Sequence, residues 1–390
     1  MEKSISNRFY FDYNATSPLS NKVIDFLRSG DFLFGNPASL HTTGKHAKKF
    51  INETSQFLFS TFGLDQKNFE LIYHSGATEA INTIFKGNAL VDFKNKKKSL
   101  FVFSAVDHQA VMALKEDLET LSHSILFFDV DKNGEFNVDS LIEKINKIKS
   151  NYSNIYLNFT YVNNETGVVW PLSLAEKIKA ETGAFVYVDA VQLVGKIENW
   201  KDLSHNLDGY FFSAHKFGAF KNIGFTFLKV GSPYHSLLTG GNQQKSLRSG
   251  TENALGIYSI KLALTEIIER FHFNESSEAK LFLEQNIKNI LGPKGLIVAE
   301  QAKLKNVNTI FFIVFGEKAE SLSMKFDMNK MDVSTGSACS SGIIKENRVL
   351  IAMGHSLEDS RSCIRLSFSP YLNQVDAANY LEAIKSVIKR

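Results

Sequence analysis

The segment Ser213-Ala214-His215-Lys216 places a hydroxyl, an imidazole and an amine side by side, directly after the apolar run Tyr210-Phe211-Phe212. The apolar run is typical of a buried strand, so Lys216 is expected at a strand end. A lysine amine in a dry pocket loses its proton more easily and can form a Schiff base with a carbonyl cofactor. The alternative is a surface lysine after a strand, and these four residues alone leave both interpretations open.

The surrounding chain predicts the elements that must position this lysine. Seven short apolar runs alternate with amphipathic segments, which predicts a mostly parallel seven-stranded α/β sheet flanked by helices. We expect its strands at 71–73, 100–103, 125–128, 155–161, 185–188, 209–212 and 224–228. Further strands are expected at 309–315 and 364–368, and helices at 44–62 and 374–388.

Polar side chains follow five of the seven expected strands, in the segments 75–78, 107–108, 163–165, 189–192 and 213–216. Ligands of such sheets bind outside the carboxyl ends of the strands. These side chains are therefore expected to converge at one edge of the sheet, around Lys216.

Gly76-Ala77-Thr78 is expected at a strand-to-helix junction, where backbone N–H groups and the positive end of a helix favour an anion. Thr78, Ser213 and His215 could add donors to a phosphate at this place. A plain helix cap is the alternative.

Asp189 follows an apolar strand, where an unpaired carboxylate is costly to bury. A pyridinium nitrogen would keep it ionised, as in a pyridoxal-phosphate enzyme, and a helix N-cap is the alternative. Gln192, three residues later, could hydrogen-bond the phenolic oxygen of that cofactor. His108 suits an imidazole that stacks over the ring and moves protons, or a partly buried histidine satisfied by its neighbours.

Arg365, between apolar residues on an expected strand, could bind a substrate carboxylate through two N–H groups or form a structural ion pair. Cys339 lies in the small-residue loop 334–342, where a thiol can swing toward a substrate and attack it once its pKa is lowered. An incidental loop cysteine is the alternative. Cys363, beside Ile364, is expected to be structural.

The length of 390 residues favours two domains. We expect a large cofactor-binding domain at 15–272 and a smaller α+β domain, formed by 1–14 and 273–390, that carries the Cys339 loop. The polar stretch 274–277 is taken as the break between them. A net charge of +3 gives no argument for nucleic acid or an anionic membrane, and no run has the length of a signal peptide core or a membrane span. Two cysteines, with no metal-ligand spacing, favour a reducing, cytoplasmic setting and no metal site.

In their order along the chain, eight motifs resemble those of the pyridoxal-phosphate-dependent cysteine desulfurases of the class V aminotransferase family, which have fold type I. The motifs lie between Phe9 and Leu381, at 12–16, 35–41, 75–79, 162–165, 188–192, 213–216, 248–251 and 336–341. The resemblance implies that Lys216 carries pyridoxal 5'-phosphate, that Asp189 pairs with its ring nitrogen and that Gln192 meets its phenolic oxygen.

The remaining site residues that the resemblance implies fall into three groups. The phosphate would be held by Ala77, Thr78, Ser213 and His215, with Thr251 reaching the cofactor of the partner subunit across a homodimer. His108 would stack on the ring and take part in catalysis. Asn14, Asn164 and Arg365 would face the substrate, and Cys339 would accept the sulfur.

The implied activity converts L-cysteine to L-alanine, with the sulfur held as a persulfide on Cys339. An acceptor protein would then receive the sulfur for iron–sulfur cluster assembly or tRNA thiolation. The alternatives are a selenocysteine lyase or another enzyme of this fold, and a non-catalytic sulfur-assembly subunit. Three departures from the family pattern bear on substrate preference and rate, namely Trp170, Asp107 and the segment 217–222.

Overall fold

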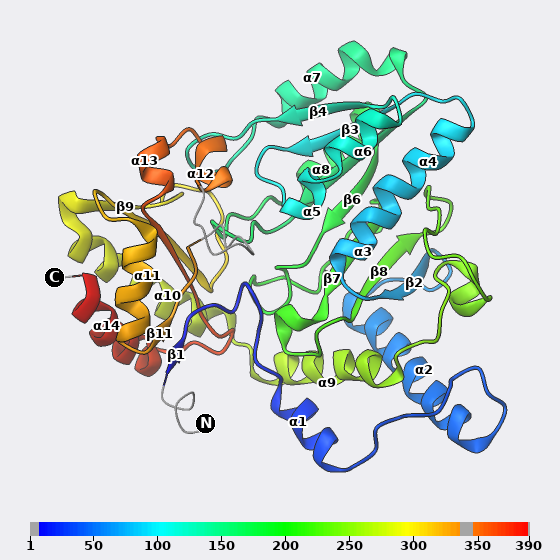
Figure 1. The fold of residues 1–390 in the computed structure, drawn as a ribbon, viewed down its shortest axis with the longest axis horizontal. Helices are drawn as coiled ribbons and strands as arrows, with labels where there is room; N and C mark the ends of the chain where they lie inside the picture. The colour runs from blue at the N-terminus through cyan, green and yellow to red at the C-terminus, as the bar shows by residue number, and fades with distance from the viewer. Residues whose placement is uncertain (1–7, 336–345, 389–390) are drawn as a thin grey trace.

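The chain folds into a seven-stranded sheet with helices on both faces and a second, smaller unit beside it (Figure 1). The computed structural model describes residues 8–335 and 346–388. In spatial order, the strands of the large sheet are β2 (Phe69–His74), β8 (Gly224–Lys229), β7 (Gly209–Ser213), β6 (Phe185–Asp189), β5 (Asn154–Thr160), β3 (Ser99–Ser104) and β4 (Ser124–Phe128).

The predicted mostly parallel sheet is confirmed, with each expected strand within two residues of the observed one. Only β8 runs against its neighbours, β2 and β7. Because β2 and β7 both oppose β8, β2 runs in the same direction as the parallel strands. All five strand ends that carry polar residues therefore lie at one edge of the sheet.

Apolar side chains on both faces explain why these runs form buried strands, since every residue of β3 and of β7 is buried. One face packs beneath α3 (Ala77–Ile81), α4 (Gly87–Lys94), α5 (Gln109–Met112) and α6 (Lys115–Thr120). The other face packs on α1 (Asn21–Arg28), α2 (Thr42–Phe62), α7 (Val138–Ile148), α8 (Leu172–Thr182) and α9 (Ala254–Arg270). In the described part of the chain, no helix has the length and apolar character that crossing a membrane requires.

The smaller unit is built on the antiparallel strands β9 (Gly295–Ile297), β10 (Thr309–Val314) and β12 (Cys363–Ser367). The N-terminal strand β1 (Phe9–Tyr10) pairs with β11 (Met331–Asp332), so the start of the chain lies with its C-terminal part. The helices of this unit are α10 (Phe273–Leu291), α11 (Ala319–Met328), α12 (Arg348–Ala352), α13 (Leu357–Ser360) and α14 (Gln374–Ile388).

The polar stretch 274–277 does not break the chain, contrary to expectation, because it forms the first turns of α10. Glu275 is favoured at this helix start, and the buried Ser276 hydroxyl donates to Pro370 O at 2.9 Å. The two helices separate at Phe271 and His272 instead. The division into domains 15–272 and 1–14 with 273–390 stays a prediction.

Candidate active site

A cavity of about 130 Å³ lies at the carboxyl edge of the large sheet. Residues at or after the carboxyl ends of five strands line it, namely Ala77, Thr78, Ile81, His108, Thr160, Val162, Asn164, Asp189, Val191, Gln192, Ser213, His215 and Lys216. A larger, more open hollow of about 730 Å³ beside Phe220 contains none of these side chains. The structure thus brings most of the site residues expected from the sequence into one small cavity.

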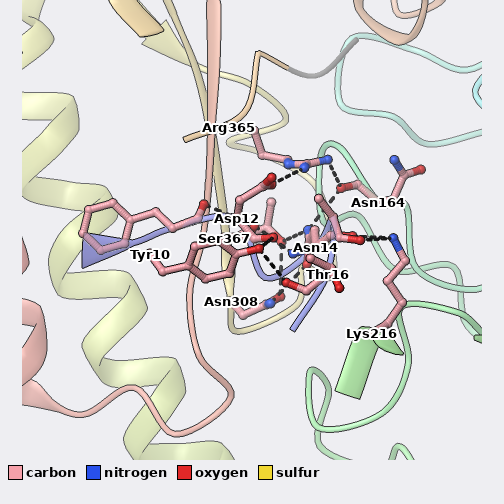
Figure 2. Close-up of polar contacts among 12 residues, drawn as sticks. Tyr10, Asp12, Asn14, Thr16, Asn164, Lys216, Asn308, Arg365 and Ser367 are labelled. Carbon is pink, nitrogen blue, oxygen red and sulfur yellow. Dashed lines mark hydrogen bonds and ion pairs between the residues drawn. The ribbon is translucent and has the colours of Figure 1, made fainter. Parts of the chain in front are cut away.

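Lys216 lies in a single 3₁₀ turn (Ala214–Phe217) that follows β7 and ends at Gly218, whose φ of +97° favours glycine. Its Nζ donates to the carbonyl oxygens of Asn14, at 2.8 Å, and Ala15, at 2.7 Å (Figure 2). Burial, and then the positive charge of Arg365, lowers the pKa of Lys216 to about 8. A larger share of this amine is therefore unprotonated near neutral pH, as attack on a carbonyl carbon requires.

Asp189 ends β6 with a buried carboxylate that forms no ion pair with any described residue. Its Oδ1 accepts one hydrogen bond, from Val191 N at 3.0 Å. Burial, with a further contribution from the negative charge of Asp107, raises the pKa of Asp189 to about 7. A buried carboxylate of this kind is stabilised in its ionised form by a cation in the cavity. Asp189 therefore fits the protonated ring nitrogen of pyridoxal phosphate.

The site also combines a helix start with three polar side chains. The helical run that begins at Ala77 continues through a π-helical turn (Asn82–Lys86) into α4, and Ala77 N donates to Ser213 Oγ at 2.8 Å. His215 Nδ1 forms a hydrogen bond with Thr16 Oγ1 at 3.1 Å. Burial lowers the pKa of His215 to about 4. Together with Thr78, these groups form a polar end that fits a phosphate.

His108 caps α5, because its Nδ1 accepts from Ala110 N at 3.1 Å. The ring proton therefore lies on Nε2. Loss of hydration, followed by the positive charges of Lys216 and Arg348, lowers the pKa of His108 to about 4. The imidazole is thus a neutral side chain at the cavity, able to stack on a flat ring.

Arg365 on β12 belongs to the smaller unit and does not line the cavity, although its positive charge contributes to the lowered pKa of Lys216. Its Nη2 donates to Asp12 Oδ1 at 2.8 Å and its Nη1 to Asn164 O at 3.0 Å, as Figure 2 shows. Its buried Nε has no hydrogen-bond partner among the described residues. Buried donors without a partner are rare. The expected contact of Arg365 with a substrate carboxylate stays a prediction.

Asn14 is buried, and it does not line the cavity. Its Nδ2 donates to Asn164 O at 3.1 Å and Thr309 Oγ1 at 2.9 Å. Its Oδ1 accepts from Asn308 Nδ2 and from Lys196 Nζ, both at 3.1 Å. Asn14 thus joins the two units through its side chain, and its expected contact with substrate stays a prediction.

Of the other predicted residues, Thr251 does not line the cavity. Thr251 is exposed. Three residues before it, Arg248 forms an ion pair with Glu79 of α3, with 2.9 Å between Arg248 Nε and Glu79 Oε1. Cys339 lies outside the described residues. Cys363, by contrast, is buried, and its thiol donates to Thr335 O at 3.3 Å. Burial raises the pKa of this thiol to about 12, which is consistent with the expected structural role.

The three departures from the family pattern lie in different surroundings. Trp170 is a core residue that does not line the cavity, with Nε1 donating to Gly134 O at 2.9 Å and Phe136 packed edge-on against its ring. Asp107 is buried beside the cavity, and its carboxylate accepts from Thr160 Oγ1 at 2.6 Å and Ser104 N at 3.0 Å. The segment 217–222 contributes Phe220 to the larger hollow.

Sequence reasoning missed two residues that the fold brings to the site. Arg348 of α12 donates to the carbonyl oxygens of Ala105 and Asp107, next to His108. Lys196 is buried behind Gln192, at the end of the turn after β6. The one local signal for Lys196 is the preceding Gly195, whose φ of +66° marks a tight turn.

Residues 9–379 match the family model of class V aminotransferases. The cysteine desulfurase IscS of Dictyoglomus turgidum is 32% identical over 393 residues, covering 98% of this chain and 94% of that protein. A protein of Bacillus subtilis described as putative cysteine desulfurase IscS 1 is 30% identical, covering 98% and 99%. The solved structure of a NifS-like protein from Rickettsia africae has a TM-score of 0.85 at 25% identity, covering 98% of this chain and 100% of that one.

Proposed function

This chain belongs to the class V aminotransferase family, and from that premise we propose that it is a pyridoxal-phosphate-dependent cysteine desulfurase. The observation that carries the proposal is one cavity that joins the amine of Lys216 to the buried carboxylate of Asp189. Relatives described as cysteine desulfurases align with nearly the whole chain, which supports this activity over others of the same fold.

The residues that would hold the cofactor follow from the geometry of the cavity. Lys216 would bond covalently to the cofactor aldehyde, and Asp189 would keep the ring nitrogen protonated. The phosphate would be held by Ala77, Thr78, Ser213 and His215, while Gln192 would donate to the phenolic oxygen and His108 would stack on the ring. When bound, pyridoxal phosphate supplies an electron-withdrawing ring that stabilises negative charge on the α-carbon of an attached amino acid.

The substrate L-cysteine would bind through its carboxylate to Arg365, beside Asn164. The guanidinium donates to Asp12 and to Asn164 O, so the substrate carboxylate would take the place of one of these acceptors. Lys216, once free of the cofactor, would remove the α-proton, and the burial that lowers its pKa favours the unprotonated amine that this step needs.

Sulfur transfer requires a thiolate, and the family resemblance assigns it to Cys339. This thiolate attacks the sulfur of the substrate, the Cβ–S bond breaks, and a persulfide forms on Cys339 while the carbon fragment is protonated and leaves as alanine. Cys363 is unsuited to the task, because its thiol is buried and its raised pKa keeps it protonated.

The wider setting of the reaction is also part of the proposal. We propose a twofold homodimer in which Thr251 reaches the cofactor phosphate of the partner, consistent with its exposure here. A sulfur-acceptor protein of iron–sulfur cluster assembly or tRNA thiolation would take the persulfide sulfur in the cytoplasm.

The test is incubation of the purified protein with L-cysteine and a reductant, with alanine and sulfide measured separately. The wild-type protein should be yellow and should release both products in equal amounts. Lys216→Ala should bind no cofactor covalently and release neither product. A wild-type protein that stays colourless after addition of pyridoxal phosphate contradicts the proposal.

A further inference from the structure

Lys196 is a buried lysine that the proposed reaction leaves unused. Only 2% of its surface is exposed, and it forms no ion pair with a described carboxylate. Its Nζ donates to Asn14 Oδ1 at 3.1 Å and to Gln192 Oε1. Burying a lysine without a counter-ion is costly, so its retention behind the cavity calls for a specific role.

The hydrogen bonds of the Gln192 side-chain amide indicate this role. The Nζ of Lys196 donates to the amide oxygen of Gln192, and it can do so whether the amine is charged or neutral. The Nε2 of the same amide donates to the backbone oxygen of Asn14 at 2.9 Å. If the amide were flipped, its oxygen would face the Asn14 backbone oxygen and its nitrogen would face Lys196 Nζ. The contacts with Asn14 and Lys196 therefore both favour the same amide orientation.

The selected orientation leaves one amide hydrogen for the cavity. The second Nε2–H of Gln192 has no partner among the described residues, and Gln192 lines the cavity beside Asp189 and Lys216. We propose that Lys196 is a positioning residue that fixes the Gln192 amide with its free N–H toward the phenolic oxygen of the cofactor. This inference rests on the proposed function only in taking pyridoxal phosphate as the group bound in the cavity.

The contacts do not depend on the charge of Lys196. Burial, together with the positive charges of Lys216 and Arg365, lowers the pKa of Lys196 well below its usual value. A neutral amine still carries two hydrogens, one for Gln192 and one for Asn14. Lys196 in turn contributes to the lowered pKa of His215, and it forms no ion pair with a carboxylate in the described part of the chain.

The experiment compares Lys196→Met with the wild-type protein, both loaded with pyridoxal phosphate and titrated by visible absorbance without substrate. Methionine keeps the length of the side chain and removes the donor. The phenolic oxygen next to the Lys216 nitrogen then receives a weaker amide hydrogen bond and holds the proton of that nitrogen more tightly. The pH midpoint of the visible band should rise by about 0.5 to 1 unit, the equivalent of one hydrogen bond.

Three further variants separate positioning from a general structural effect. Lys280→Met removes another buried lysine, which contacts Glu284 in the smaller unit, and should leave the midpoint unchanged. Lys196→Met should add no shift in a Gln192→Ala background. Lys196→Gln, which keeps an N–H donor, should lie closer to the wild type than Lys196→Met. Lys196→Leu, which also lacks a donor, serves in place of Lys196→Met if methionine prevents folding.

The outcomes distinguish failure of the inference from failure of the proposed function. A wild-type protein without any pH-dependent visible band contradicts the proposed function. A normal wild-type titration with an unshifted Lys196→Met protein overturns the positioning role. So does a shift that persists undiminished in the Gln192→Ala background, or one that is equal for Lys196→Met and Lys196→Gln.

Discussion

Replacement of Asp189 by asparagine should stabilise the cofactor-free protein at high pH, although it removes a residue of the proposed active site. Burial raises the pKa of Asp189 from 3.8 to about 7 in the folded protein. A carboxyl group with a raised folded pKa contributes stability that is complete below pH 4 and is lost as the pH rises toward 7. Asparagine has nearly the same shape, can still accept from Val191 N and carries no charge to desolvate.

The size of the gain follows from that shift in pKa. About 3 pKa units at 1.36 kcal/mol each give an upper limit of about 4 kcal/mol, and relaxation of the site leaves an expected gain of about 2 to 4 kcal/mol at pH 8. Urea denaturation of the cofactor-free wild-type and Asp189→Asn proteins at pH 4.5 and pH 8 measures it. The gain should be small at pH 4.5.

A matched control separates this effect from the loss of any buried aspartate. Asp92 accepts hydrogen bonds from Ser99 Oγ, Asn154 Nδ2 and Tyr156 Oη, at 2.7, 2.9 and 2.9 Å. Asp92→Asn should therefore lose stability at both pH values. Adding the cofactor should reverse the sign for Asp189→Asn, because the wild-type carboxylate then gains its cationic partner. An Asp189→Asn protein that is no more stable than the wild type at pH 8 would refute the reasoning.

Four other substitutions test three separate parts of the account. Arg365→Met should raise KM for L-cysteine by about 10- to 100-fold, the loss of a charge-assisted hydrogen bond or two, with the cofactor spectrum intact; an unchanged KM contradicts its role. Cys339→Ser should bind the cofactor yet release essentially no alanine or sulfide, whereas Cys363→Ser should keep most of the activity; wild-type turnover by Cys339→Ser would make that thiol a bystander. Trp170→Phe should lower the free energy of unfolding by about 1 kcal/mol, through loss of the hydrogen bond to Gly134 O, without a change in KM; a large change in KM would instead tie Trp170 to substrate binding.

The sheet and the cavity could be predicted because the signals for them are local. Each strand is a short apolar run, and the polar residues at or after its end, such as Asp189 at the end of β6, meet at one edge because parallel strands end together. The antiparallel course of β8 carried no such signal. Its apolar run looks like that of a parallel strand, and its direction depends on the connections around it.

The contacts between distant segments could not be predicted from local patterns. Arg365 pairs with Asp12, 353 residues away, and Asn14 pairs with Lys196 across 182 residues. Each partner is an ordinary polar residue in its own segment, so only the folded chain shows that the pairs meet behind the cavity. The start of α10 was misjudged for a related reason, since the polar residues 274–277 resemble a linker until Ser276 is seen to be buried.

Sulfur transfer through Cys339 is the central claim, and one measurement tests it most directly. The protein loaded with pyridoxal phosphate is mixed with L-cysteine in the absence of reductant and quenched after a single turnover. Alanine is then quantified, and mass spectrometry locates any added sulfur. The account predicts one added sulfur on the peptide that contains Cys339, equal in amount to the alanine formed. Alanine without added sulfur on Cys339, or added sulfur on Cys363 instead, would contradict it.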